Sequence, residues 1–164
     1  MKQIIYLLVL ASCCFLSGFS SLVQAESLTY EGKSGVGKGK HIVFIASDHE
    51  YRGEESCPAI ARILAHRYGF KCTVLFGLDD KGHIKAGSSH VPGIEALDKA
   101  DMMFLFMRFL RPNDAWMKHF VGYLDRGGPV LGLRTTTHAF NGLKGKYAHY
   151  NFNSRNEKFD WGFG

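Results

Sequence analysis

The sequence predicts an α/β fold, a doubly wound parallel sheet with helices on both faces. Two observations predict it. Short apolar runs rich in branched residues, typical of strands buried on both faces, alternate with stretches whose apolar residues have helical spacing. Parallel strands separated in this way are joined by right-handed crossovers. The 164 residues are 46% hydrophobic and 13% aromatic, which indicates a globular chain with one domain as the default.

The first 25 residues are typical of an export signal. Lys2 precedes an apolar stretch, and Val23 and Ala25 are suitably placed for a cleavage that leaves Glu26 first. A membrane span needs about 20 continuous apolar residues, and "SGFSS" interrupts this stretch. We therefore expect a secreted or periplasmic protein with no membrane span after cleavage. Lipidation at Cys13, within "LASC", is the less favoured alternative.

Residues 26–40 are predicted to form a flexible linker, because "EGKSGVGKGK" is rich in Gly and Lys and has no apolar period. A domain is then expected over 41–164. We predict its strands over 41–46, 70–76, 101–107 and 129–133. Helices are predicted over 54–68, over 94–99 and through "RPNDAWMKHFVGYLDRGG", where Trp116 and Phe120 pack on one stripe and Gly127 ends the helix. The polar stretch 77–93 is a loop longer than a simple connection needs.

The pattern fades after Asn141, although a doubly wound sheet usually continues. The sequence therefore predicts that the domain is incomplete at its carboxyl end. Cys57 and Cys72 fall in a helix and in the next strand, so two buried free thiols are favoured over a disulfide. The formal charge of +5 is spread along the chain without a dense basic stripe, so nucleic acid is a poor candidate partner.

Polar side chains gather where three of the predicted strands end. Ligands of open parallel sheets bind at the carboxyl ends of the strands, so we expect these side chains to share one rim. They are Asp48, His49, Glu50, Tyr51 and Arg52 after the first strand, Arg108 and Arg111 after the third, and Arg134, Thr135, Thr136, Thr137 and His138 after the fourth.

Two stretches resemble a known family. "KHIVFIASDHEYRGEESCPAIARILAHRYGFKCTVLF" and the later "MRFLRPNDAWMKHFVGYLDRGGPVLGLRTTTHAF" are similar to the trehalose-utilisation (ThuA-like) domain, a relative of class I glutamine amidotransferases. The resemblance covers residues 40 to 141, and "GLRTTTHAF" is its most specific part. It implies a flavodoxin-like sheet and a link to carbohydrate metabolism in bacteria.

The amidotransferases place a nucleophilic cysteine in a tight elbow, G-x-C-x-G, after this strand. Here Gly132 fits the pattern, but Arg134 occupies the cysteine position. An arginine keeps its proton in proteins and cannot act as a nucleophile. Cys57 and Cys72 lie away from the elbow, so the sequence argues against thiol-based glutamine hydrolysis.

The sequence instead favours binding of a small-molecule carbohydrate, with hydrolysis or another acid-base conversion as the enzymatic hypothesis. His138 and Glu50 are the candidate proton carriers, because both can exchange protons with a sugar hydroxyl. The candidate substrate-binding residues are Asp48, His49, Tyr51, Arg52, Arg108, Arg134, Thr135 and Thr137. A noncatalytic carbohydrate-binding or sensory module of the cell envelope is the competing class.

Other interpretations of the rim stay open at this stage. Arg134 could pair with Asp48 or Glu50 and simply hold two loops together. A metal held by His49, Glu50 and His138 is less favoured, because no H-x-x-x-H or C-x-x-C spacing supports it. The sequence names no cofactor and leaves a homo-oligomer open.

Overall fold

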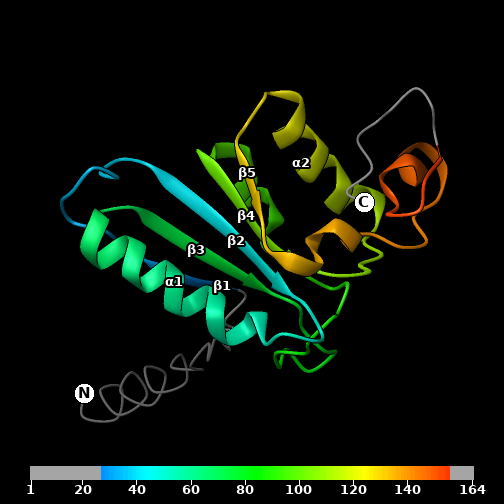
Figure 1. Ribbon diagram of the computed structural model, residues 1–164, viewed down its shortest axis with the longest axis horizontal. Coiled ribbons are helices and arrows are strands. Elements are labelled where there is room, and N and C mark those ends of the chain that lie inside the picture. Colours follow the sequence, from blue (N-terminus) through cyan, green and yellow to red (C-terminus); the bar gives the residue numbers. More distant parts are fainter. Residues whose placement is uncertain (1–26, 156–164) are drawn as a thin grey trace, which may run out of the picture.

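The computed structural model describes residues 27–155 and has a mixed α/β fold (Figure 1). Its sheet has five strands in the order β1-β3-β2-β4-β5. The strands are β1 (Ser27–Tyr30), β2 (His41–Ser47), β3 (Lys71–Phe76), β4 (Met102–Met107) and β5 (Val130–Gly132). Strands β2 to β5 are parallel to their neighbours, as predicted, and β1 pairs antiparallel with β3.

Helices pack on both faces of the sheet, because successive residues of a strand point to opposite sides. Ile42 and Phe44 of β2 join a core with α1 (Gly53–Tyr68). Val43 and Ile45 join a second core with the 3₁₀ helix η1 (Ile94–Lys99) and with α2 (Asp114–Asp125). Figure 1 shows α1 and α2 on opposite sides of the strands. The predicted layers are thereby confirmed.

Local signals fix the ends of the two α-helices. Gly69 adopts a left-handed conformation (φ 84°) directly after α1, and its N–H donates to the Ala65 and Leu64 carbonyls. Asn113 caps α2, where its side-chain oxygen accepts the Trp116 N–H at 2.9 Å. Trp116 and Phe120 are buried and stacked with ring centroids 5.5 Å apart, so their predicted role in helix packing is confirmed.

The prediction of a flexible linker before β2 is wrong. Residues 27–30 form β1, which covers the edge of β3, and the Gly37 N–H donates to the Tyr68 carbonyl at 2.8 Å. A Cβ on Gly32 would overlap the Gly69 backbone, and one on Gly37 would overlap the Phe70 ring. The glycines of this segment therefore permit close packing against the end of α1. The amino-acid composition alone could not distinguish this role of glycine from a role in a flexible linker.

The segment after β5 also has more structure than the sequence predicted. The chain forms η2 (Arg134–His138) and η3 (Gly145–Tyr150), and Phe140, Leu143 and Tyr147 are buried in the same core as α2. Asn151 closes this segment: its side chain accepts the Leu143 N–H at 2.8 Å and donates to the Leu143 carbonyl at 3.0 Å.

Several sequence predictions concern residues outside 27–155. The export signal at 1–25, Cys13 and the last residues of the 41–164 domain lie beyond the described part of the chain. Cys57 and Cys72 lie within it and are free and buried, which confirms the prediction made for them. No helix between residues 27 and 155 is long and apolar enough to cross a membrane.

Candidate functional site

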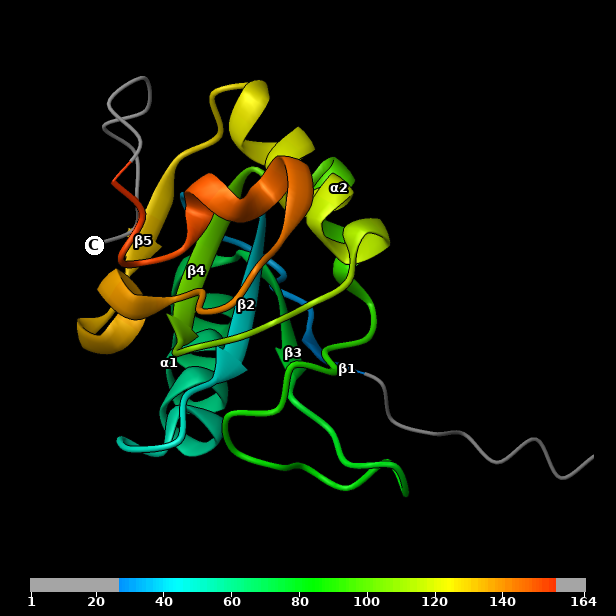
Figure 2. The same cartoon turned by 90° about the vertical axis from the view of Figure 1, so that its right-hand side faces the viewer.

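The segments that follow β2, β4 and β5 meet at one end of the sheet (Figure 2). Backbone hydrogen bonds join them: the Arg108 N–H donates to the Ser47 carbonyl at 3.3 Å, and the Phe109 N–H donates to the His138 carbonyl at 2.8 Å. Residues more than 80 positions apart in the chain therefore form one rim, as the strand order predicted.

Asp48 ties two of these segments together. Its side chain is buried, with 1% of the residue exposed. Oδ1 accepts the N–H groups of Glu50 and Tyr51 at 2.8 and 2.7 Å, and Oδ2 accepts the hydroxyl of Thr135. We predicted that Asp48 and Thr135 contact the substrate. In the structure both residues are buried, and their side chains form hydrogen bonds with each other or with the backbone. Their role is to fix the shape of the rim.

Glu50 and Arg108 form an ion pair across the rim through Oε1 and the Nη1 group. The suggested pairing of Arg134 with Asp48 or Glu50 is not found. Arg108 also lies over the ring of Phe109, with Cζ 4.5 Å from the ring centroid. The Nε–H of Arg108 is buried and has no hydrogen-bond partner within the described residues. A buried donor of this kind is uncommon and costs free energy unless a ligand or water accepts from it.

Four rings form a cluster beside this ion pair. The Phe109 centroid lies 6.1 Å from that of His49, 5.9 Å from that of His138 and 5.2 Å from that of Phe152. His138 and Phe152 are 4.9 Å apart. The Nδ1 atom of His138 shares a hydrogen bond with the Thr137 hydroxyl at 2.9 Å. The cluster thus offers apolar ring surface next to imidazole groups.

Sequence reasoning did not select Phe109 or Phe152 for this site. Phe109 lies between the two arginines of "RFLR", two residues beyond the predicted strand 101–107. Phe152 belongs to the tail whose pattern had faded, and its position depends on a backbone hydrogen bond from its N–H to the Phe140 carbonyl at 2.9 Å. Only the tertiary structure brings the two phenylalanines together.

Backbone strain is concentrated at the same rim. Within residues 27–155, three residues other than glycine have positive φ: Arg52 (53°), Phe109 (56°) and Arg134 (38°). One follows each of β2, β4 and β5. Such a conformation costs about 1–2 kcal/mol for a residue with a Cβ, and strain of this kind clusters at functional sites. The strain supports the assignment of the rim as the site.

The turn after β5 has the elbow form that the sequence suggested. A Cβ on Gly132 would lie 2.9 Å from Cγ2 of Thr136, so a glycine lets the chain fold back tightly. Arg134 occupies the strained central position, and its Cζ lies 4.3 Å from the centroid of the Tyr51 ring. The elbow therefore presents a guanidinium group at its strained central position.

The two cysteines cannot replace the missing nucleophile. Burial raises the pKa of the Cys57 thiol to about 12, with Glu54 adding to the effect, and raises that of Cys72 to about 11. Both thiols thus stay protonated at neutral pH, whereas the thiolate is the reactive form. Cys57 lies on the buried face of α1 and Cys72 lies within β3, so neither reaches the elbow.

The remaining candidates lie at the outer part of the rim. The Arg52 side chain is 74% exposed and pairs with Glu55. Arg111 is exposed and donates its Nε–H to the Asn141 carbonyl at 2.8 Å. No group of three His, Cys, Asp or Glu side chains in the described part of the chain is arranged to hold a metal ion.

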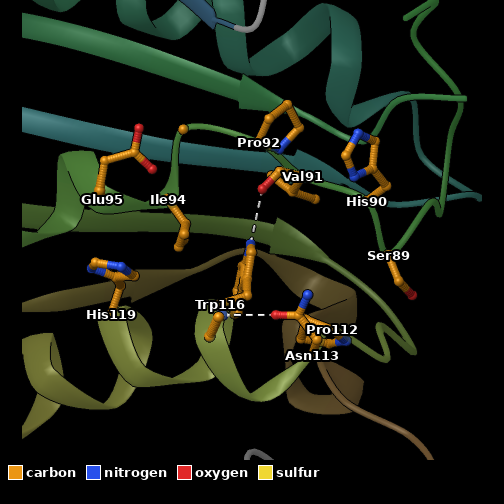
Figure 3. A pocket seen from close by; sticks show the side chains of 12 residues that line it. Ser89, His90, Val91, Pro92, Ile94, Glu95, Pro112, Asn113, Trp116 and His119 are labelled. Carbon is orange, nitrogen blue, oxygen red and sulfur yellow. Dashed lines mark hydrogen bonds between the residues drawn. The ribbon is translucent and has the colours of Figure 1, made fainter. Parts of the chain in front are cut away.

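One surface pocket lies away from this rim. It has a volume of about 310 Å³ and lies between the segment 89–95 and the start of α2 (Figure 3). Trp116 stands at its centre, and the indole N–H donates to the Val91 carbonyl at 3.0 Å. None of the predicted site residues lines it. A second pocket of about 170 Å³ lies at the elbow, lined by Val130, Gly132, Arg134, Thr136 and Thr137.

Comparisons of the chain with protein-family models, with curated proteins and with solved structures found no match. The chemistry of the site therefore has to be inferred from the residues themselves.

Proposed function

We propose that the protein is an exported, ThuA-like domain with a flavodoxin-like sheet, and that it binds a sugar or sugar derivative at the carboxyl ends of β2, β4 and β5. One observation carries the proposal. Phe109 brings His49, His138 and Phe152 together beside the ion pair of Glu50 and Arg108. A sugar has both apolar C–H faces and hydroxyl groups, and this rim offers both kinds of surface.

The apolar and the polar surface would bind different parts of the sugar. The rings of Phe109 and Phe152 cover a C–H face of the sugar, since aromatic side chains bury a large apolar area. Arg108 supplies forked donors for hydroxyl oxygens, including the buried Nε–H that has no partner in residues 27–155. His49 and Tyr51 are exposed at the same rim and extend the polar side.

The enzymatic form of the proposal assigns proton transfer to His138 and Glu50. The Thr137 hydroxyl occupies Nδ1 of His138, which leaves Nε2 for a substrate hydroxyl or glycosidic oxygen. Glu50 keeps Oε2 outside its ion pair with Arg108. Hydrolysis, or another acid-base conversion of the sugar, needs such a pair of groups. Arg134 at the elbow and the buried cysteines argue against glutamine hydrolysis through a thiol.

A noncatalytic binding or sensory module is the second candidate, and the ion pair favours it. A carboxylate held by an arginine is a weaker base than one that faces the substrate alone. Glu50 then fixes the position of Arg108 and takes no proton. In this form the rim binds the sugar without changing it.

A ligand screen with one matched pair of variants tests the proposal. The protein would be titrated with a panel of glycosides and oxidised glycosides, and each mixture would be analysed for products. The variants are His138→Ala and, as a control, His66→Ala, which removes an exposed imidazole from α1.

The outcomes separate the candidates. Turnover that is lost in H138A and kept in H66A supports the enzyme. Binding without turnover, weakened only in H138A, supports the module. If no member of the panel binds, the proposal of a carbohydrate site is wrong.

A further inference from the structure

The charges at the rim indicate which kind of sugar derivative would bind there. Arg108 is neutralised by Glu50, and Arg52 by Glu55. Arg134 differs from both. Among residues 27–155, no carboxylate lies within ion-pair distance of its guanidinium group. The elbow therefore carries a positive charge that no described side chain balances.

This charge is nevertheless held in a defined place. The guanidinium group lies over the Tyr51 ring, with Cζ 4.3 Å from the centroid, which restricts a side chain that otherwise has many rotamers. The backbone of Arg134 is in the left-handed region at φ 38°. A glycine or asparagine would adopt that conformation more easily. The structure thus accepts strain to place an arginine at this position, a pattern typical of functional residues.

Arg134 also lines the smaller pocket. Its volume of about 170 Å³ is below the roughly 300–1,000 Å³ of pockets that hold a complete small ligand. The hydroxyl of Thr137, which also lines the pocket, lies 2.9 Å from Nδ1 of His138. A pocket of this size next to His138 suits one functional group of a larger ligand.

Arg111 does not offer a comparable position. It too has no carboxylate within ion-pair distance in the described range. Its Nε–H, however, is donated to the Asn141 carbonyl at 2.8 Å, and it does not line the pocket at the elbow. Arg134 is therefore the arginine best placed to meet a charged group on a ligand held by the ring cluster.

We infer that the ligand is an acidic sugar and that Arg134 binds its carboxylate in the pocket at the elbow; this inference rests on the proposed carbohydrate site. A guanidinium group matches a carboxylate with two parallel hydrogen bonds. Arg134 is the one arginine in the described range that lines this pocket, and its one positive charge suits a single negative charge, as a carboxylate carries. A phosphate group carries about −1.5 to −2 at neutral pH and would leave an excess of negative charge.

The experiment compares matched neutral and acidic sugars. Isothermal titration measures the affinity of the protein for methyl glycosides of glucose, galactose and mannose and for the corresponding methyl uronosides, which differ only by the carboxylate. The variants are Arg134→Gln, Arg134→Lys and the control Arg62→Gln. Arg62 is exposed on α1, so R62Q makes the same change in net charge away from the rim.

We expect wild type and R62Q to bind at least one uronoside about tenfold or more tightly than its neutral partner, the gain of one charge-assisted pair. R134Q removes that preference. R134K keeps the charge, loses the forked geometry and retains part of the preference. Circular dichroism shows whether each variant folds, and R134K decides the question should R134Q fail to fold.

Two results would overturn the inference and leave the carbohydrate site standing. One is equal affinity of wild type for the neutral and acidic members of every pair. The other is a uronoside preference that R134Q, or R134K in its place, leaves unchanged. Binding of neither kind of sugar refutes the carbohydrate site itself and the inference with it.

Discussion

At the scale of single residues, Asp48 connects the segments after β2 and β5. It accepts two backbone N–H groups from its own segment in part-buried bonds and one buried hydroxyl from η2. A carboxylate that serves three donors at once is difficult to replace, because each donor left without an acceptor in the interior costs free energy.

We expect Asp48→Ala to destabilise the protein by about 2–4 kcal/mol, since it leaves two backbone N–H groups without their acceptor. Thr135→Val removes only the hydroxyl that donates to Asp48 and should cost about 1 kcal/mol. Urea unfolding followed by circular dichroism measures both changes. Equal losses in the two variants would contradict the role assigned to Asp48.

The residue scale also shows what sequence reasoning could reach at the site. His49, Glu50, Arg108, Arg134 and His138 were found because strand ends in a parallel sheet share one edge. Their roles were harder to assign, since Asp48 and Glu50 look alike in the sequence. One is buried among donors and the other is paired with Arg108. Burial and partner choice depend on packing, which a local pattern does not encode.

At the scale of elements, α1 begins from a strained residue. Arg52 occupies the N-cap position in the left-handed region (φ 53°, ψ 49°), and no side chain caps the helix there. Its carbonyl accepts the Ser56 hydroxyl at 2.9 Å, a bond that does not need the arginine side chain. The start of α1 is therefore held through the Arg52 carbonyl, which also accepts the N–H groups of Glu55 and Ser56, while the Arg52 side chain is mostly exposed.

We expect Arg52→Gly to stabilise the protein by about 0.5–1 kcal/mol. Glycine removes the left-handed penalty of about 1–2 kcal/mol and loses part of the gain to backbone entropy. Arg62→Gly is the matched control, because Arg62 is exposed in the middle of the same helix. There glycine should cost about 1 kcal/mol. Thermal unfolding of both variants should move in opposite directions, and a loss of stability in both would refute the account.

His41, the first residue of β2, makes the stability of the protein depend on pH. Burial, with a smaller contribution from Lys71, lowers the pKa of His41 below its ordinary value of 6.5. Its Nε2 shares a hydrogen bond with the Thr73 hydroxyl of β3 at 2.9 Å. The unfolded chain therefore takes up a proton near pH 6.5, whereas the folded protein does so only at lower pH. Protonation thus favours unfolding, and stability falls as the pH drops below about 6.5.

We expect the free energy of unfolding of wild type to fall between pH 7 and pH 5, and to fall less in His41→Gln, which keeps a hydrogen-bonding group near Thr73. Other histidines contribute equally to both proteins, so the difference between the two curves isolates His41. Urea titrations at several pH values measure it. Parallel curves would show that His41 does not contribute.

The same scale shows why most elements, but not all, were predictable. Strands β2, β3 and β4 are mostly apolar because helices cover both of their faces, and this leaves a clear pattern. Strand β1 has four residues at an edge and is largely exposed, so "SLTY" carries no such signal. Its pairing with β3 is a long-range contact. The backbone hydrogen bonds that position η3 and Phe152 are also tertiary contacts, and no local sequence pattern predicted them.

At the scale of the whole molecule, the two edges of the sheet differ. Strand β1 closes the edge beside β3, and Thr29 and Thr73 share a hydrogen bond at 3.1 Å across that pair. The other edge is β5, where Val130 and Leu131 are 39% and 38% exposed. An unprotected edge strand can pair with another chain. The segment before β2 therefore protects the sheet on one side, which a flexible linker would not do.

This difference leads to a prediction for two truncated proteins. Removal of residues 1–25, the segment that the export proposal assigns to the signal, leaves β1 whole and should not change the stability of the fold. Removal of residues 1–40 takes away β1, the packing of Gly32 and Gly37 on the end of α1, and the ion pair of Glu31 with Lys71. Stability should then drop by roughly 2–4 kcal/mol, because several ladder hydrogen bonds of about 0.5–1.5 kcal/mol each are lost.

Thermal unfolding and light scattering distinguish these outcomes. The protein that lacks residues 1–40 should unfold at a lower temperature and aggregate on heating, since the exposed edge of β3 presents unpaired N–H and C=O groups to other chains. The protein that lacks only residues 1–25 should unfold as a single cooperative unit and stay soluble to a higher temperature. If both melt together, β1 adds nothing to the stability of the fold. If both aggregate, residues 1–25 contribute to the folded domain and cannot be a segment that is removed on export.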